Sequence, residues 1–210
     1  MTPARARRPA PLTASGDSDY SQRQRQILDN ARTIFARYGY RKATIEDIGK
    51  ACGLGKAALY HYYPGKEEIF AEVVRVETDR LLDQIRAAVD AARGPRARLV
   101  AALTTSVRAA SARIGELVGP ASAAELRASL PLAGRHLQRF RDEEAAILRG
   151  ILDDGARRGV FKRLGSPSVP LLIIAGLRGV QLHLLDLDNP PKLDDALDSL
   201  LAIFLEGICR

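Results

Sequence analysis

The chain has 210 residues, 46% of them hydrophobic and 27% charged, which is enough for one or two folded domains with a sizeable core. Its net charge is +7, and the excess lies in the first 66 residues: residues 21–66 carry nine Arg or Lys against three Asp or Glu, whereas residues 67–210 are neutral. Such local positive charge attracts phosphate, although a basic face that meets only solvent is the alternative interpretation.

No stretch approaches the ~20 apolar residues that cross a bilayer, and no apolar run follows the N-terminal arginines, which argues against a secretory signal. The two cysteines, Cys52 and Cys209, lack the spacing of a zinc site, and we expect no cofactor. This cysteine usage fits a reducing compartment, so we expect a cytoplasmic protein.

Residues 1–20 are rich in Pro, Ala, Arg and Ser, a composition that predicts a disordered basic tail. Its three arginines leave open that the tail is an arm that follows DNA. An amphipathic helix is then expected from about Ser21 to Tyr38, ended by Gly39. Its apolar side chains fall on one helical face: Ile27, Ala31, Ile34, Phe35 and Tyr38.

Residues 44–66 predict two short helices joined by a tight turn. Thr44 and Asp47 have the spacing of a capping box, and Gly53 lies where the end of a helix often needs a positive φ. A second helix is expected over residues 56–63, stopped by the proline that follows. Two helices of this length around a glycine turn predict a helix-turn-helix, whose second helix lies in the major groove of DNA.

The rest of the chain favours helix throughout, and no period-2 runs indicate strands. The expected fold class is therefore all-α, with about nine helices. The further helices are expected over residues 66–92, 95–113, 121–129, 131–158, 169–187 and 193–208, with a break at 115–120 and a loop at 161–168.

The stretch TIEDIGKACGLGKAALYHYYPGK at residues 44–66 resembles the DNA-binding domain of TetR-family transcriptional regulators. The likeness rests on the helix-turn-helix, on the preceding amphipathic helix that ends in Tyr-Gly, on the Leu59-Tyr60 pair, on Tyr63 and on Lys66. It covers roughly residues 21–70, and beyond them the chain resembles the family only in its length and helical layout.

The resemblance implies a homodimer whose two recognition helices read a palindromic operator in double-stranded DNA. It implies an N-terminal three-helix DNA-binding domain at residues 21–66, and a helical effector-binding and dimerisation domain at residues 67–210 that releases the DNA when a small molecule binds. Such a protein is a transcriptional regulator, and we expect a repressor. The DNA-binding residues implied by the resemblance are Thr44, Lys56, Ala57, Ala58, Tyr60, His61, Tyr62 and Lys66.

These residues have separate implied roles. The resemblance makes Thr44, Tyr60 and Lys66 phosphate contacts, which fix the register on DNA but carry no sequence information. It places residues 56–58 against the bases, where a lysine can donate to guanine and alanines can touch thymine methyl groups. It gives residues 61 and 62 contacts to base or backbone, and for Tyr60 and His61 the alternative is that both are ordinary surface aromatics.

Three positions depart from the family's usual pattern. Gly55 stands where Ser or Thr is frequent, so the recognition helix lacks a side-chain cap. Gly49 and Cys52 stand where alanines are common. Because glycine in a helix interior costs about 0.8–1.0 kcal/mol relative to alanine, Gly49 is expected to weaken the first short helix.

The last two helices, residues 169–187 and 193–208, are too apolar to be covered within one small domain. We expect them to pair with those of a second copy as a four-helix bundle, the alternative being that both are monomer core. The effector is expected among the helices of residues 66–158, where His136, Arg139 and Phe140 are candidates to line a pocket, although surface or core packing is the commoner role. The histidines form no metal-spaced cluster, so no metal site is expected.

The alternative function is a helical small-molecule carrier or an enzyme, with a basic N-terminal unit that binds nucleic acid without sequence preference. No nucleophile–base pair, phosphate loop or paired carboxylates stand out in the sequence, so we expect no enzymatic activity.

Overall fold

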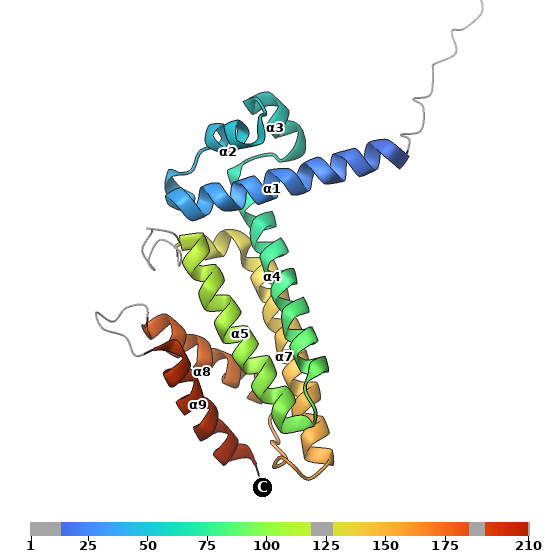
Figure 1. Ribbon diagram of the computed structural model, residues 1–210, viewed down its shortest axis with the longest axis vertical. Helices are drawn as coiled ribbons and strands as arrows, with labels where there is room; N and C mark the ends of the chain where they lie inside the picture. The colour runs from blue at the N-terminus through green and yellow to red at the C-terminus, as the bar shows by residue number, and fades with distance from the viewer. Residues whose placement is uncertain (1–13, 119–127, 185–191, 210) are drawn as a thin grey trace, which may run out of the picture.

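The computed structural model describes residues 14–118, 128–184 and 192–209, and the structural statements that follow concern these ranges. Their regular structure is helical (Figure 1), apart from one isolated antiparallel bridge between Phe161 and Cys209. The all-α class expected from the sequence is confirmed. The elements are α1 (Ala14–Lys42), α2 (Ile45–Cys52), α3 (Lys56–Tyr62), α4 (Lys66–Ala91), α5 (Pro95–Val118), the 3-10 helix η1 (Leu130–Ala133), α7 (Gly134–Arg157), α8 (Val169–Leu184) and α9 (Leu193–Ile208).

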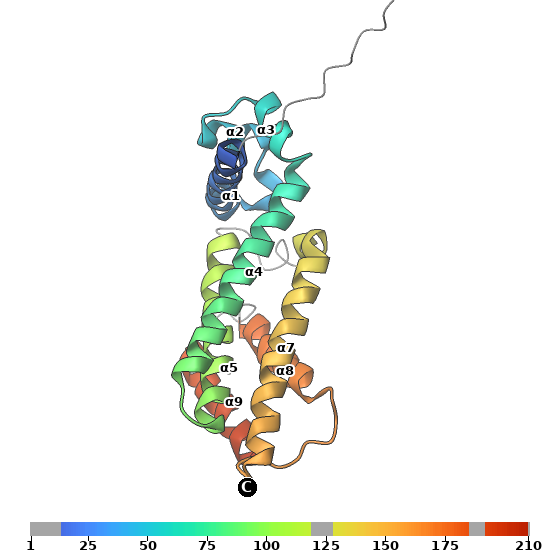
Figure 2. The same ribbon diagram turned by 90° about the vertical axis from the view of Figure 1, so that its right-hand side faces the viewer.

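The helices divide the molecule along its long axis (Figures 1 and 2). The first three gather at one end, and α4 runs from that end along much of the molecule, with α5 and α7 packed against it. Helix α8 contacts both α5 and α7, and α9 packs on α8. In the described ranges no helix is both long enough and apolar enough to span a bilayer.

Buried side chains form two clusters. The first joins α1, α2 and α3 to the start of α4, and it includes Ile27, Phe35, Ile48, Leu59 and Ile69, all without exposed surface. The second joins α4, α5, α7, α8 and α9. Because burial of apolar surface dominates folding, each cluster holds its own group of helices, and α4 links the two.

The first helix is longer than expected. It begins at Ala14, so residues 14–20 are helical rather than part of a tail, whereas residues 1–13 lie outside the described ranges. It ends at Lys42 after a kink at Gly39, which has φ 76°. The side chain of Tyr38, expected on the buried face, is 40% exposed. Tyr20, which lies within this extension, contacts α3.

The boundaries of α5 and α7 also differ from the expected ones. Helix α5 continues through Gly115 to Val118, because one glycine costs a helix only about 1 kcal/mol and does not have to end it. A 3-10 turn precedes α7 at Pro131. The helix expected over residues 121–129 lies mostly outside the described ranges, as does the expected end of α8. Helices α3, α4 and α9 have the expected bounds to within one residue.

Candidate nucleic-acid interface

Caps at both ends of α2 fix the turn that leads to α3. The Thr44 hydroxyl accepts a hydrogen bond from the Asp47 amide at 3.1 Å, and the Thr44 amide donates to the Asp47 carboxylate at 3.0 Å. Hydrogen bonds from Thr44, chiefly from its side chain, lower the pKa of Asp47. At the other end Gly53 adopts φ 65°, and its amide and that of Leu54 donate to carbonyl groups in the last turn of α2. The expected capping box and glycine cap are confirmed.

Gly49 faces this turn at close range. A Cβ atom at that position would lie 2.8 Å from the carbonyl oxygen of Leu54, closer than such atoms approach. The Leu54 amide in turn donates to the Gly49 carbonyl at 2.8 Å, so the turn is packed directly onto α2. The expected weakening of α2 by Gly49 is thus set against a steric reason for glycine at this position, because an alanine would gain helix propensity but displace the turn.

One face of helix α3 packs into the core and the opposite face is exposed to solvent. Leu59 has no exposed surface and Tyr63 is 8% exposed, so both belong to the core, as expected. Burial raises the pKa of Tyr63 to about 12. Gly55 precedes the helix without a side-chain cap. The outward side chains are Lys56, Ala57, Ala58, Tyr60 and His61, which are all exposed, and Tyr62, which is half-buried.

Lys56 lies at the start of this outward face beside a carboxylate. Its Nζ donates to Glu46 Oε1 at 2.6 Å, and both side chains are about half exposed, at 55% and 50%. This hydrogen bond raises the pKa of Lys56 and lowers that of Glu46. An exposed pair of this kind contributes little to stability and is weakened by salt, so Lys56 remains available to another acceptor. Glu46 was not foreseen, because no motif links it to the recognition helix.

The far end of α3 rests on the start of α1. The rings of Tyr20 and Tyr62 stack with their centroids 4.9 Å apart, and Tyr20 meets the ring of His61 edge-on at 6.1 Å. The Tyr20 hydroxyl also lies 3.5 Å from the His61 carbonyl oxygen. Tyr20 thus supports two residues of the outward face. It was placed in the tail by its sequence context, and only the fold reveals this role.

Lys66 lies at the start of α4 and is turned inward. Its Nζ donates to the carbonyl oxygens of Tyr40 at 2.9 Å and Ala43 at 3.0 Å, with that of Arg41 at 3.5 Å. The ammonium group also lies 4.4 Å from the centroid of the Tyr40 ring. Since an ammonium has three donors, these acceptors engage all of them. The geometry therefore favours a role for Lys66 in joining α4 to α1 over the expected phosphate contact.

Cys52 and the side chains able to bind metal were also placed by the fold. Burial raises the pKa of the Cys52 thiol, which makes it a poor nucleophile. Among the described residues no group of three or more His, Cys, Asp or Glu side chains could hold a metal ion.

The three residues expected to line an effector pocket face a small hollow between α4 and α7. His136, Arg139 and Phe140 lie there with Arg75 and Asp79. The hollow is largely filled, because Arg139 pairs with Glu143 at 2.7 Å and lies 3.5 Å from Asp79. Burial lowers the pKa of His136.

Comparison with known proteins gives the same assignment to this unit. Residues 27–73 match the family of bacterial regulatory proteins, tetR family. The HTH-type transcriptional repressor KstR2 of Rhodococcus jostii is 37% identical over 102 residues, which cover 49% of this chain and 50% of that protein. KstR2 of Mycolicibacterium smegmatis is 25% identical over 193 residues, 92% of this chain and 94% of that protein.

A transcriptional regulator from Cytophaga hutchinsonii has a similar structure, with a TM-score of 0.71 and 26% identity over 89% of this chain and 98% of that one. The match to the first curated relative thus spans about half of that protein's length, whereas the structural match extends over both groups of helices. The helix-turn-helix geometry, the family match and the shared fold agree: residues 27–73 form a helix-turn-helix domain of the tetR family of bacterial regulatory proteins, in a chain whose overall fold is similar to that of the Cytophaga regulator.

Proposed function

We propose that the chain is a sequence-specific DNA-binding transcriptional repressor that acts in the cytoplasm as a homodimer on a palindromic operator. The observation that carries the proposal is the outward face of α3, which offers cationic, small and aromatic side chains above a buried Leu59. This face lies in the segment that holds nearly all of the chain's excess positive charge. The KstR2 relatives are named HTH-type transcriptional repressors, which supports repression rather than activation.

In this proposal the start of α3 reads the bases. Lys56 donates to guanine, and Ala57 and Ala58 let the helix approach closely enough to touch thymine methyl groups. Thr44 and Tyr60 contact phosphates on either side, with His61 and Tyr62 touching base or backbone. Lys66 is left out of the contacting set because its donors are engaged by backbone carbonyl groups.

The second copy in this proposal binds through α8 and α9. The three most exposed large apolar side chains of the described ranges lie on these helices: Leu171, Leu172 and Ile203, at 49%, 64% and 68%. An exposed apolar patch of this kind favours a protein partner. Pairing of both helices with their mates would form a four-helix bundle across a two-fold axis. Residues 21–66 are then the DNA-binding domain and residues 67–210 the effector-binding and dimerisation domain.

Sedimentation equilibrium at micromolar concentration tests the dimer. We expect the mass of two 22.8 kDa chains for the unaltered protein and a shift toward monomer for Leu172→Asp. Tyr38→Asp is the control, because Tyr38 is 40% exposed but lies on α1, away from α8. A monomer in the unaltered protein, or equal dissociation by both variants, would contradict the proposed interface.

Selection of bound sequences from a random duplex library at physiological salt tests the DNA-binding function. We expect a palindrome whose half-sites are about one helical turn apart, or a multiple of that distance. Binding without any enriched sequence, lost as salt rises, would leave only non-specific attraction to phosphate and would refute the proposal.

A further inference from the structure

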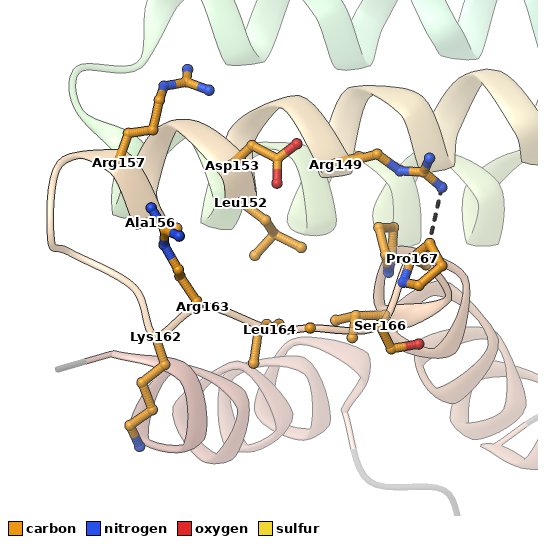
Figure 3. Close-up of a pocket in the computed structure, with 13 residues that line it drawn as sticks. Arg149, Leu152, Asp153, Ala156, Arg157, Lys162, Arg163, Leu164, Ser166 and Pro167 are labelled. Carbon is orange, nitrogen blue, oxygen red and sulfur yellow. Dashed lines mark hydrogen bonds between the residues drawn. The ribbon is translucent and has the colours of Figure 1, made fainter.

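A cavity of about 530 Å³ lies at the end of the molecule opposite the helix-turn-helix (Figures 1 and 3). One wall is the second half of α7, and the other is the extended segment 162–168 with the first turn of α8. The volume falls in the range of about 300–1,000 Å³ that small-molecule sites occupy. It is separate from the small hollow around His136.

The lining combines an apolar floor with an excess of positive charge. Leu152 and Ala156 of α7 contribute apolar surface to one wall, and Leu164 and Val169 contribute it to the other. Around them stand four cationic side chains and a single acidic one, Asp153. The cations are Arg149, Arg157, Lys162 and Arg163.

Three of these cations already have partners. Arg149 Nη2 donates to the Pro167 carbonyl oxygen at 3.1 Å, across the cavity wall. Lys162 Nζ donates to the carbonyl oxygen of Gly207 at 2.9 Å, and Figure 3 shows it directed away from the cavity. Arg157 lies 3.3 Å from the Asp154 carboxylate.

Arg163 differs from them, because it has neither a hydrogen bond nor an ion pair with any of the described residues. Figure 3 shows its side chain reaching from the extended segment toward Ala156 on α7. Arg163 is exposed, so its five N–H donors are free to meet an acceptor that enters the cavity. A guanidinium in this position suits a carboxylate or another oxyanion, which it can bind through two parallel hydrogen bonds.

We propose that this cavity binds an amphipathic anion, an organic molecule with an apolar body and one oxyanion group. The body rests on Leu152 and Leu164, and the anion meets Arg163. Asp153 on the same wall disfavours ligands with several negative charges, since like charges repel across a short distance. The apolar floor disfavours small inorganic anions, which would leave that surface uncovered.

The site is also placed to affect the proposed dimer. Val169 and Pro170 line the cavity, and the next two residues of α8 are the exposed Leu171 and Leu172. A ligand that spans α7 and the start of α8 would therefore alter the position of the proposed dimer face. This consequence rests on the proposed function, because a ligand changes DNA affinity only if it binds the two states of the dimer differently.

Fluorescence titration without DNA tests the site itself. The probes are anilinonaphthalene sulfonate, an apolar anion, and N-phenylnaphthylamine, which has the same rings and no charge. We expect Arg163→Ala to weaken binding of the anionic probe by about tenfold, the loss of one charge-assisted hydrogen bond, and to leave the neutral probe unchanged. Leu164→Ser should weaken both probes.

The matched control is Arg158→Ala. Arg158 is an exposed neighbour on the same basic end of the molecule, paired with Asp154 at 3.0 Å, and it does not line the cavity. It should bind both probes like the unaltered protein. Equal affinity of Arg163→Ala and the unaltered protein for the anionic probe, or equal losses in the two arginine variants, would overturn the proposal.

Repeating the titration in the presence of the selected operator duplex distinguishes ligand binding at the cavity from an effect of that ligand on DNA affinity. Release of DNA by the anionic probe from the unaltered protein, but not from Arg163→Ala, would support the link to regulation. If the probe binds as expected but DNA affinity stays unchanged, the site stands and its coupling to the dimer is refuted. Failure to select any operator would refute the proposed function alone.

Discussion

The substitution Gly49→Ala distinguishes the sequence-based expectation from the structure most sharply. Helix propensity alone predicts that alanine in the interior of α2 stabilises the protein by about 0.8–1.0 kcal/mol. The structure predicts the opposite sign, because the new Cβ would lie 2.8 Å from the Leu54 carbonyl oxygen. That oxygen belongs to the backbone of the turn, which cannot rotate away as a side chain can.

The cost of this contact can be estimated from core substitutions that add a methyl group to a filled site, at about 1–3 kcal/mol. Subtracting the gain in propensity leaves a net loss of roughly 0–2 kcal/mol in the free energy of unfolding. The same displacement would shift α3 relative to α2, so we also expect weaker operator binding.

Gly150→Ala provides the control. Gly150 is an exposed residue within α7, and a Cβ atom there would meet nothing within 4 Å. It should therefore show the full gain of about 0.8–1.0 kcal/mol. Both variants would be compared by urea unfolding at one fixed protein concentration, because the stability of a dimer depends on concentration. If Gly49→Ala stabilised the protein as much as Gly150→Ala, the steric argument would be refuted.

Three further predictions follow from buried or engaged polar groups. Lys66→Ala should lower the free energy of unfolding by roughly 1–3 kcal/mol, because backbone carbonyl groups lose their donor, without changing the slope of log affinity against log salt. If the slope in Lys66→Ala were instead smaller by about 1, Lys66 would contact a phosphate as first expected. Lys50→Ala, at an exposed lysine, is the comparison variant. Arg178→Ala should cost about 3 kcal/mol, because Glu144 is 3% exposed and would lose its charged partner at 2.6 Å, keeping only the hydrogen bond from the Ser106 hydroxyl. A loss well below that, measured by urea unfolding, would mean that water already solvates Glu144. The free energy of unfolding should fall as pH rises from about 10 to 12, because an unfolded tyrosine ionises near 10 whereas burial raises the pKa of Tyr63 to about 12 in the folded state. Tyr63→Phe should remove that part of the fall. An identical pH profile in the variant and the unaltered protein would contradict this prediction.

The helix-turn-helix was predictable because its signals are local. The capping box of Thr44 and Asp47 and the positive φ of Gly53 each depend on neighbours within one or two turns. The resemblance then carried the assignment from these residues to the fold of the whole chain. The bounds of α9 were equally accessible, since its apolar stripe is uninterrupted.

What could not be predicted depends on contacts between distant segments. The acceptors of Lys66 lie on the far side of the helix-turn-helix, at the end of α1. Tyr20 reaches Tyr62 only after α1 has packed against α3. Gly49 is constrained by a turn that its own helix propensity does not describe. The cavity near Arg163 forms only where the α7–α8 connection folds back along α7, so composition alone gave no sign of it.

Base contact by Lys56 at the start of α3 is tested most directly by comparing random-library selections for the unaltered protein and for Lys56→Ala. We expect a palindrome with the same half-site spacing in both selections, with base preference relaxed in the variant at one position in each half-site. Such a change corresponds to a loss of about 1–3 kcal/mol of discrimination at that position. Identical preferences in the two selections, or uniformly weaker binding to every sequence, would contradict the claim that this lysine contacts a base.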